Sequence, residues 1–453
     1  MLPTGCRPIV AKIPQEALLR FTESGVFDAD WYVRTFPDVA SSGMDPAEHF
    51  LWLGAKLGRR PHGPQGARFD APVLTGQQRY DAFFIDGTNG TASTSYRVDL
   101  IAQGLADLGW RTGSCSFKQA AEALGAADFS CRFLIIHRAY DFEAMRDTIL
   151  DLRSRGTVIV YDVDDLVFDL DVLPYVDAYH HMPDTHRRMF ERSFLAVREF
   201  VLNADVCTTS TEFLANELRK VGKRAYRVRN SIARDTIDAF DRLAVRFEKR
   251  PSPFVVGYYS GTKTHQADFA VVAPALIDFM EDHDDVVFRL VGALDLADYP
   301  QLAAWARPVT GPPRVITGSL MPHAVMLRDQ LTCDLIIAPL EIGNPFCEAK
   351  SELKFFEAAL ARCPVIAAAT TTFIAATDGG RLASLAANTS DWRSAFEAIY
   401  SDYDAALERA EAAYSWVCEF YSQHAAAREA RAAYEDFWGA EALFTGASAR
   451  LSC

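Results

Sequence analysis

The stretch APLEIGNPFCEAKSELKFFEAALARCPVIAA (338–368) contains one strand–loop–helix–strand unit, and it predicts the fold of most of the chain. An apolar strand end leads into a loop with Gly343, Asn344 and Pro345, then a helix expected to begin near residues 349–351, then the apolar run PVIAA. Short apolar strands that alternate with helices of about 10–15 residues predict a parallel sheet built from βαβ units. Ligands of such sheets bind where the carboxyl ends of the strands meet loops and helix N-termini, so the unit also indicates where a site lies.

The same alternation fills most of the chain and restarts once. The first series has the candidate strands YDAFFID (80–86), RFLIIH (132–137), TVIVYD (157–162), ADVCTTS (204–210) and RAYRVRNS (224–231). After the linker EKRPSP (248–253), FVVGYYS (254–260) begins a second series, in which we expect one long helix over about 266–281 and the further strands VVFRLVG, RVITGSL, DLIIAPL and PVIAAAT. We therefore predict an α/β chain with two Rossmann-like, doubly wound domains that face a cleft.

The two ends of the chain have a different character. Residues 1–70 predict a small helical module and a linker, with Asp28 and Asp45 as helix N-caps and Pro46 in a first helical turn. Residues 71–250 and 251–400 are the expected Rossmann-like domains. Residues 401–453 are rich in Ala, Glu and Arg, and their apolar spacing predicts one or two long packing helices.

Composition excludes several classes of function. The formal net charge of -14 argues against nonspecific binding of nucleic acid and against a polybasic contact with anionic lipid. The nine cysteines are odd in number and form no CxxC pair, which indicates reduced thiols instead of a disulfide framework or a zinc site. Neither a signal peptide nor a transmembrane run is evident, so we expect a cytoplasmic protein.

The opening stretch carries the strongest candidate site. Lys350, Ser351 and Lys354 lie between Glu348 and Glu357, at the expected start of a helix. A helix N-terminus with free N–H groups and nearby ammonium groups suits a diphosphate, and a carboxylate further along the helix can accept hydrogen bonds from ribose hydroxyls. Ordinary Glu–Lys pairing on a surface helix is the alternative explanation.

A second candidate follows the strand FVVGYYS. The turn with Gly261, Thr262 and Lys263 connects this strand to a helix, and Thr264 is a plausible N-cap. Glycine permits close approach of the backbone to a ligand, and Lys263 stands where a phosphate could lie. A tight turn with a solvated lysine explains the same residues.

In the first half, the turn GTNGTASTSYRVDL (87–100) follows the first strand and opens a helix. Gly90 and Arg97 are candidates for binding an acceptor on the side of the cleft opposite the donor. Glycine-rich first turns are frequent in Rossmann-like domains, so an ordinary structural turn is the competing explanation.

The run YDVDDLVFD (161–169) places Asp162, Asp164 and Asp165 at a strand end. These carboxylates could bind Mg²⁺ or Mn²⁺, orient an acceptor hydroxyl or take its proton, or simply cap the loop. His137 and Arg138 end the neighbouring strand and are expected at the same edge of the sheet.

These segments together resemble a known family. The runs GYYSGTKTHQADFAVVAPAL (257–276) and PLEIGNPFCEAKSELKFFEAAL (339–360) resemble the donor-site signature of GT-B glycosyltransferases, especially the retaining family-4-like group of bacterial polysaccharide-assembly enzymes. WYVRTFPDVASSGMDPAEHFLWLGAKLGRRP (31–61) is similar to a short module attached to such enzymes. The resemblance implies transfer of a sugar from a nucleotide-sugar to a glycan, lipid-linked glycan or protein, with retention and without a metal or other cofactor. It also implies terminal helices that cross back to the first domain.

By this resemblance, Lys263 corresponds to the basic residue at the donor diphosphate, and Lys350 and Ser351 match the helix start near the phosphates. Glu357 matches the carboxylate that binds the ribose. Glu348 stands near the one that contacts the sugar, but it lies nine positions before Glu357, one more than is usual for this signature. We expect His137, Asp164, Asp165 and Glu348 to serve catalysis.

Two other classes of function remain open from the sequence. A nucleotide-sugar epimerase would use the same architecture with acid–base carboxylates and no separate acceptor. A non-catalytic glycan-binding or scaffold protein would use the aromatic residues of the first module, among them Trp31, Tyr32 and Trp52, as an interaction surface. The base and sugar of the donor, the acceptor, the oligomeric state and any proximity to a membrane are not encoded in a pattern that we recognise.

Overall fold

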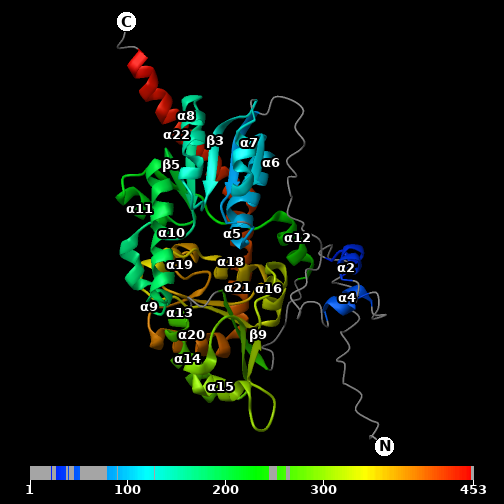
Figure 1. The fold of residues 1–453 in the computed structure, drawn as a ribbon. Helices are drawn as coiled ribbons and strands as arrows, with labels where there is room; N and C mark the ends of the chain where they lie inside the picture. Colours follow the sequence, from blue (N-terminus) through cyan, green and yellow to red (C-terminus); the bar gives the residue numbers. More distant parts are fainter. Residues whose placement is uncertain are drawn as a thin grey trace, which may run out of the picture.

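The computed structural model describes residues 22, 27–36, 39, 45–51, 79–88, 90–126, 128–243, 253–261 and 266–449, with side chains of the last helix described up to residue 439. Two α/β bodies make up most of the molecule, the first in the upper half of Figure 1 and the second in the lower half. Each contains a six-stranded sheet in which the strands run parallel to their neighbours.

The first sheet has the strand order β2-β1-β3-β4-β5-β6. Its strands are β1 (Arg79–Asp86), β2 (Thr112–Ser116), β3 (Ser130–His137), β4 (Val158–Val163), β5 (Val206–Thr209) and β6 (Ala225–Arg227). The chain moves outward in one direction from β1 to β2 and in the other direction from β3 onward. The loops after β1 and β3 therefore flank the point where a doubly wound sheet binds its ligand.

The second sheet has the order β12-β11-β10-β7-β8-β9. Its strands are β7 (Phe254–Ser260), β8 (Val286–Gly292), β9 (Val315–Gly318), β10 (Leu335–Ala338), β11 (Val365–Ala368) and β12 (Ser384–Ala386). Here the reversal lies between β7 and β10, so the loops after these two strands mark the corresponding ligand position. The order of this sheet is that of a dinucleotide-binding Rossmann domain.

Helices connect the strands in both bodies. The first body contains α5 (Ala92–Thr94), a one-turn π-helix η2 (Ser95–Asp99), α6 (Leu100–Asp107), α7 (Ala120–Leu124), α8 (Arg146–Ser154), α9 (Asp177–His180), α10 (Asp184–Asn203) and α11 (Glu212–Lys220). The second contains α13 (Gln266–Ala270), α14 (Ala273–Asp282), α15 (Pro300–Ala306), α16 (His323–Asp329), α17 (Pro345–Glu348), α18 (Leu353–Leu360), α19 (Thr371–Ala376) and α20 (Thr389–Ser401). Between them in the chain lies α12 (Arg234–Leu243), whose Phe240 is buried in the core of the second body.

Two expected helices differ from the structure. The single helix expected over 266–281 is divided into α13 and α14, with Pro274 in the first turn of α14. Proline has no N–H to continue the hydrogen bonding of a preceding helix, but it fits a first turn well. The helix expected from residues 349–351 starts later, at Leu353, and the short helix α17 precedes it.

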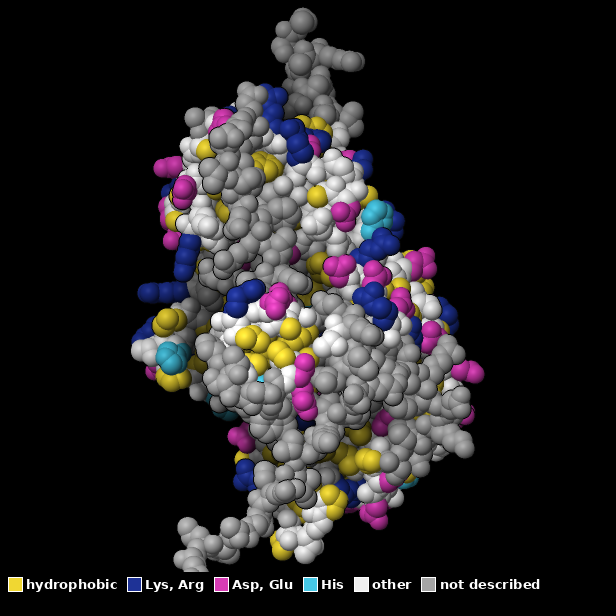
Figure 2. All heavy atoms as spheres, turned by 90° about the vertical axis from the view of Figure 1, so that its right-hand side faces the viewer, with side chains coloured by type: hydrophobic (Ala, Val, Ile, Leu, Met, Phe, Trp, Pro, Cys, Tyr) yellow, Lys and Arg dark blue, Asp and Glu magenta, His cyan; other side chains and the backbone are white. Residues whose placement is uncertain are grey.

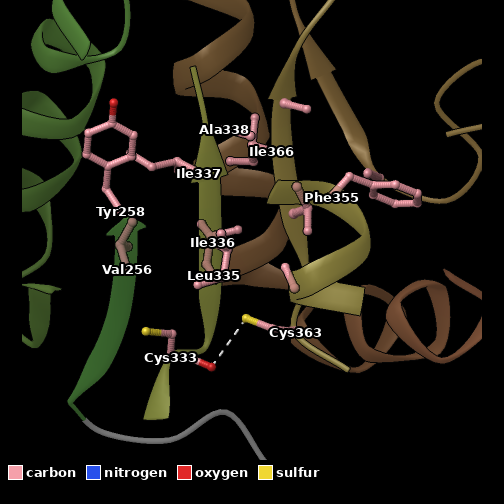
Figure 3. Packing of buried hydrophobic residues seen from close by; sticks show 14 of the residues in the cluster. Val256, Tyr258, Cys333, Leu335, Ile336, Ile337, Ala338, Phe355, Cys363 and Ile366 are labelled. Carbon is pink, nitrogen blue, oxygen red and sulfur yellow. Dashed lines mark hydrogen bonds between the residues drawn. The ribbon is translucent and has the colours of Figure 1, made fainter. Parts of the chain in front are cut away.

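The core of the second body shows why its strands are apolar on both faces. Leu335, Ile336 and Ile337 of β10 are 0–1% exposed, and helices pack against the sheet around them (Figure 3). Below the strand, the Cys363 thiol donates to the Cys333 carbonyl at 3.3 Å (Figure 3). Strands buried on both faces read as continuous apolar runs, which is the pattern that predicted them.

The terminal helices connect the two bodies. α21 (Tyr403–Phe420) packs in the core of the second body, whereas α22 (Gln423–Ala449) packs against α6 and runs along the first (Figure 1). Gly104 makes this possible, because a Cβ there would lie 2.7 Å from the Ala427 Cβ and 2.8 Å from the Gln423 carbonyl. The expected crossing of the terminal helices is thus present.

The small N-terminal unit contains α2 (Ala29–Thr35) and α4 (Pro46–His49). Asp28 accepts from the Trp31 amide at 2.8 Å, and Asp45 accepts from the amides of residues 47 and 48, so both expected N-caps are confirmed. Hydrophobic side chains gather at the height of these helices in Figure 2. The unit has its own buried cluster around Tyr32 and Phe50, against which Val325 of α16 packs.

Two further properties bear on the sequence-based expectations. Within the described part of the chain, no helix is long and apolar enough to cross a membrane. The seven cysteines in this part are free thiols, and burial raises the pKa of several of them, that of Cys207 to about 12.

Candidate functional site

The turn after β1 is organised by the carboxylate of Asp86. It accepts from the Thr88 amide (2.8 Å) and hydroxyl (2.6 Å), from the Gly90 amide (2.9 Å) and from the Thr94 hydroxyl (3.0 Å). Gly90 has a φ of 81°, a conformation that favours glycine. This backbone requirement accounts for the presence of Gly90, which is exposed at the surface of the turn.

A buried charge network lies directly beneath this turn, with Asp162 of β4 at its centre. Arg97 donates to both carboxylate oxygens of Asp162, at 2.6 and 3.0 Å, and Thr208 donates at 2.7 Å. His137 Nδ1 lies 2.9 Å from Oδ2 of the same carboxylate. Burial raises the pKa of Asp162, but Arg97 and His137 oppose this more strongly and hold the pKa well below its ordinary value.

Two predicted site residues therefore belong to the interior. Arg97 and His137 are both 0% exposed, so neither side chain reaches an acceptor or donor in this structure. Arg97 also donates to the Asn230 side chain at 3.2 Å and to the Val228 carbonyl. The expectation that Arg97 binds an acceptor directly is corrected, because its guanidinium is fully used inside the protein. Any part of His137 in the chemistry must act through a neighbour.

Asp164 and Asp165 point outward from the same strand end and share Arg138. Arg138 donates to Asp164 at 3.0 Å and to Asp165 at 3.4 Å, and these three side chains are 15–21% exposed. Burial raises the pKa of Asp164, but Arg138, His137 and the Ser93 hydroxyl lower it, with a net decrease. Asp164 is thus an ionised carboxylate between the buried network and the space between the domains.

The lysine and serine expected at the donor phosphates meet this edge from the second body. Lys350 Nζ lies 2.8 Å from Asp165 Oδ1 and 4.3 Å from the centre of the Phe346 ring. The Ser351 hydroxyl accepts from Asn230 Nδ2 at 3.0 Å. The loop with Lys350 and Ser351 therefore meets the loops after β4 and β6 across the interface, as the topology of two facing sheets predicts.

Glu357 is the third cross-domain contact. Tyr96 of the first body donates to Glu357 Oε1 at 2.8 Å, and His323 Nε2 lies 2.8 Å from the same oxygen. Tyr96 and His323 are themselves 2.6 Å apart. Glu357 is 7% exposed, and among the described residues the hydrogen bonds to its carboxylate all reach Oε1, which leaves Oε2 for a ligand.

Glu348 and Lys354 have different environments in the second body. Glu348 accepts from the Thr371 amide in the first turn of α19 at 2.9 Å and from the Gly343 amide at 3.2 Å, so its carboxylate orders the loop after β10. Lys354 lies near Asp268, Glu357 and Lys350, and its pKa is lowered, first by burial.

Gly261 is exposed at the end of β7. Thr262 and Lys263 lie outside the described residues.

The environment of Asp164 and Asp165 bears on the metal hypothesis. In the part of the chain that the structure describes, one group of three side chains is close enough to hold an ion, and it comprises Asp268, Glu341 and Cys347 of the second body. Asp164 and Asp165 instead pair with Arg138, and Asp165 also pairs with Lys350.

A cavity of ≈ 390 Å³ lies between the two bodies, next to the loop after β10. Tyr175, Asp177 and His180 line it from the first body, and Glu341 and Ala267 from the second. An aromatic ring beside carboxylates and an imidazole is a combination that can stack on a sugar ring and accept its hydroxyl protons. Sequence analysis did not predict this pocket.

Several contact residues were missed from the sequence. Ser93 lies in the predicted glycine-rich turn and bonds to both His137 and Asp164, but nothing distinguished it from its neighbouring hydroxyls. Asn230 follows a strand end, which is a weak signal. Tyr96 and His323 meet over 227 positions of sequence separation, and no local pattern indicates such a contact.

The sequence matches no protein-family model and no curated protein. The structure is similar to sucrose-phosphate synthase from Thermosynechococcus elongatus, with a TM-score of 0.53 and 14% identity over 80% of this chain and 100% of that one. It is also similar to a glycosyltransferase from Rickettsia africae ESF-5, with a TM-score of 0.52 and 13% identity over 80% and 99% of the two chains. At these identities the likeness shows the fold, and it confirms the expected two-domain GT-B architecture with terminal helices.

Proposed function

We propose that this GT-B chain is a glycosyltransferase that moves a sugar from a nucleotide-sugar to an acceptor hydroxyl. The observation that carries the proposal is the convergence of Lys350, Ser351 and Glu357 of the second body on the ligand-binding edge of the first. In doubly wound sheets that edge is where nucleotides bind. The acceptor is a glycan, a lipid-linked glycan or a protein.

The donor diphosphate is assigned to the second body. No side chain caps the N-terminus of α18, because Glu352 at that position accepts instead from the Tyr421 hydroxyl at 2.7 Å. The N–H groups of Leu353 and Lys354 in its first turn therefore have no side-chain cap and can bind a phosphate oxygen, with Lys350 and Lys354 adding positive charge. In addition, the buried Ser260 Oγ at the end of β7 and Gln266 Oε1 at the start of α13 have no partner among the described groups. Buried polar atoms of this kind normally have one, which supports a polar ligand there.

The ribose and the transferred sugar follow from this placement. Glu357 Oε2 accepts from the ribose hydroxyls while Tyr96 and His323 hold Oε1. The sugar then extends toward Glu348 and the loop after β10. The interdomain cavity beside Tyr175 and Glu341 gives room for a sugar of the donor or acceptor.

The transfer reaction is assigned to the carboxyl edge of the first sheet, where Asp164 lies. The bond between the anomeric carbon and the diphosphate oxygen breaks with its electron pair on the leaving group, whose charge Lys350 and the α18 N-terminus stabilise. The acceptor oxygen attacks from the same face, with retention, and its proton passes to Asp164. Arg138 orients that carboxylate from 3.0 Å. Cationic side chains thus take the place of a metal, and the unpaired thiols support a cytoplasmic location.

A turnover assay tests the proposal. The protein is incubated with a panel of nucleotide-sugars, with and without glycan and lipid-linked acceptors and with and without EDTA, and nucleoside diphosphate and product are measured. We expect acceptor-dependent release with one donor, insensitive to EDTA, and a product whose anomeric configuration by NMR is that of the donor. Asp164→Asn should abolish transfer, whereas Asp151→Asn, on the exposed face of α8, should not. An epimerised sugar formed from donor alone would overturn the proposal.

A further inference from the structure

Ser93, at the start of α5, connects the cleft-facing carboxylate to the buried histidine. Its Oγ lies 2.6 Å from Asp164 Oδ2 and 2.8 Å from His137 Nε2. A serine hydroxyl has one proton, so it can donate to only one of these two atoms at a time. The side chain is partly exposed, whereas His137 is fully enclosed.

The proton on the other imidazole nitrogen is fixed by Asp162. Asp162 is ionised and accepts from Arg97 and Thr208, so His137 Nδ1, at 2.9 Å, must be its third donor. This leaves two states for Nε2. When the imidazole is neutral, Ser93 donates to Nε2 and Asp164 Oδ2 loses that donor. When Nε2 carries a proton, it donates to Ser93, and Ser93 donates to Asp164.

We propose that Ser93 relays the acceptor proton from Asp164 to His137, an inference that rests on the proposed transfer reaction. The acceptor hydroxyl gives its proton to Asp164 as its oxygen bonds to the anomeric carbon and the diphosphate leaves with the electron pair. That proton passes to Ser93 Oγ while the proton of Ser93 passes to His137 Nε2. Asp164 is again a carboxylate, and the imidazolium rests against Asp162. After product release the proton returns through Ser93 to Asp164 and leaves from this partly exposed carboxyl to solvent.

Charged side chains lie at both ends of the relay, His137 and Asp164. Asp162 and Arg97 face His137 from β4 and η2, and Asp164 faces it through Ser93. Arg138 is bound to Asp164, and Lys350 reaches the adjacent Asp165. The imidazolium therefore gains a buried carboxylate partner, although Arg97 shares it. Since His137 is 0% exposed, its Nε2 proton leaves only through Ser93.

A purely structural role for Ser93 makes a different prediction. The turn is already held by the four hydrogen bonds to Asp86, none of which involves Ser93. Loss of the Ser93 hydroxyl should therefore leave the fold and donor binding intact and affect the proton path alone. Ser95, an exposed serine two residues further along the same segment, provides a matched control.

Kinetics of the full-length protein test the relay. We expect Ser93→Ala to lower kcat about 100-fold, the usual scale of acid–base assistance, with the donor KM changed less than about 2-fold. Ser93→Thr, which keeps the hydroxyl, should recover most of the rate, and Ser95→Ala should match wild type. In H2O–D2O mixtures the wild-type rate should depend on deuterium fraction along a curve, since several protons move, and Ser93→Ala should give a straight line.

A readout without turnover separates this inference from the proposed function. In ¹⁵N-histidine-labelled protein, with His137 assigned from the His137→Gln spectrum, Ser93→Ala should change the chemical shift of His137 Nε2, because that atom loses its hydrogen-bond partner, and Ser95→Ala should not. If wild type transfers sugar but Ser93→Ala keeps its rate and its curved isotope dependence, the relay is wrong and the function stands. If wild type transfers no sugar, the relay falls with the function, even where the His137 Nε2 resonance changes.

Discussion

The carboxyl edges of the two sheets use their charges in opposite ways. In the first body, Asp162 is 1% exposed and accepts four hydrogen bonds, from Arg97, His137 and Thr208. In the second, Lys350 is 22% exposed at its side chain and reaches across to the other body. The comparison teaches that a charged residue near the carboxyl edge of a doubly wound sheet is either enclosed in the fold or available to a ligand, depending on what covers it.

The cause lies in the elements that surround each residue. Asp162 stands within β4, between β3 and β5, so neighbouring strands and the turn above enclose its side chain. Lys350 stands in the loop between α17 and α18, where no strand covers it. Removing a partner of Asp162 should therefore lower the free energy of unfolding, and removing Lys350 should lower the affinity for the donor.

The largest effect is expected from Arg97→Met. It leaves Asp162 buried without its main cation, and removal of one partner from a buried pair costs about 3–5 kcal/mol of unfolding free energy. Lys350→Ala removes a partly exposed pair and should cost less than about 1 kcal/mol. Urea unfolding of both variants measures the contrast, and equal losses would contradict it.

The variant expected to change stability least, at Lys350, is expected to change the affinity for the donor strongly. Lys350→Ala and Glu357→Gln are each expected to weaken nucleoside diphosphate binding at least about 10-fold, or about 1.4 kcal/mol, because each removes a contact with the donor that we propose. Lys220→Ala, an exposed lysine on α11, is the matched control. Calorimetric titration gives the affinities; unchanged binding in both site variants would remove them from the donor site.

Acid stability sharpens the same comparison. Because the pKa of Asp162 is lower in the folded chain than in the unfolded chain, the unfolded chain binds more protons as the pH falls. Its contribution is fully present above the unfolded pKa of about 4 and is lost below it. We expect the Tm of wild type to fall more steeply below pH 4 than that of Asp162→Asn. Parallel slopes would show that this carboxylate does not carry the acid sensitivity.

The smallest effect is expected for Tyr96→Phe. The variant removes one of two groups that hold Glu357 Oε1, and His323 remains at 2.8 Å. A single hydrogen bond contributes about 1 kcal/mol, so nucleotide affinity should fall less than about 10-fold. A loss as large as that of Glu357→Gln would mean that Tyr96 itself binds the donor.

Much of the fold was predictable because both sheets are buried. Strands such as β1, β3 and β7 are continuous apolar runs that end at polar turns, and the expected ranges match them closely. β2 (TGSCS) and β12 (SLA) were not predicted, because short strands at sheet edges lack such a run. The break between α13 and α14 shows that one proline can outweigh a helical pattern.

The candidate site was predictable in place but not in its contacts. Strand ends located Asp162, Asp164 and His137, since parallel strands bring their carboxyl ends to one edge. Burial decided their roles, and burial depends on residues that are distant in sequence, such as Thr208 beside Asp162 and Val228 beside Arg97. For that reason Arg97 was assigned to an acceptor while Ser93 was overlooked.

The most direct test of the central claim is thermal unfolding in the presence of nucleoside diphosphates and nucleotide-sugars, with and without EDTA. A ligand that binds only the folded chain stabilises it by mass action, by about 2.7 kcal/mol at a ligand concentration of 100 times the Kd, and so raises the Tm. We predict that one nucleotide family raises the Tm, that EDTA leaves the shift unchanged, and that Glu357→Gln reduces it. No shift with any nucleotide at millimolar concentration would contradict the assignment of the second body as a nucleotide-sugar site.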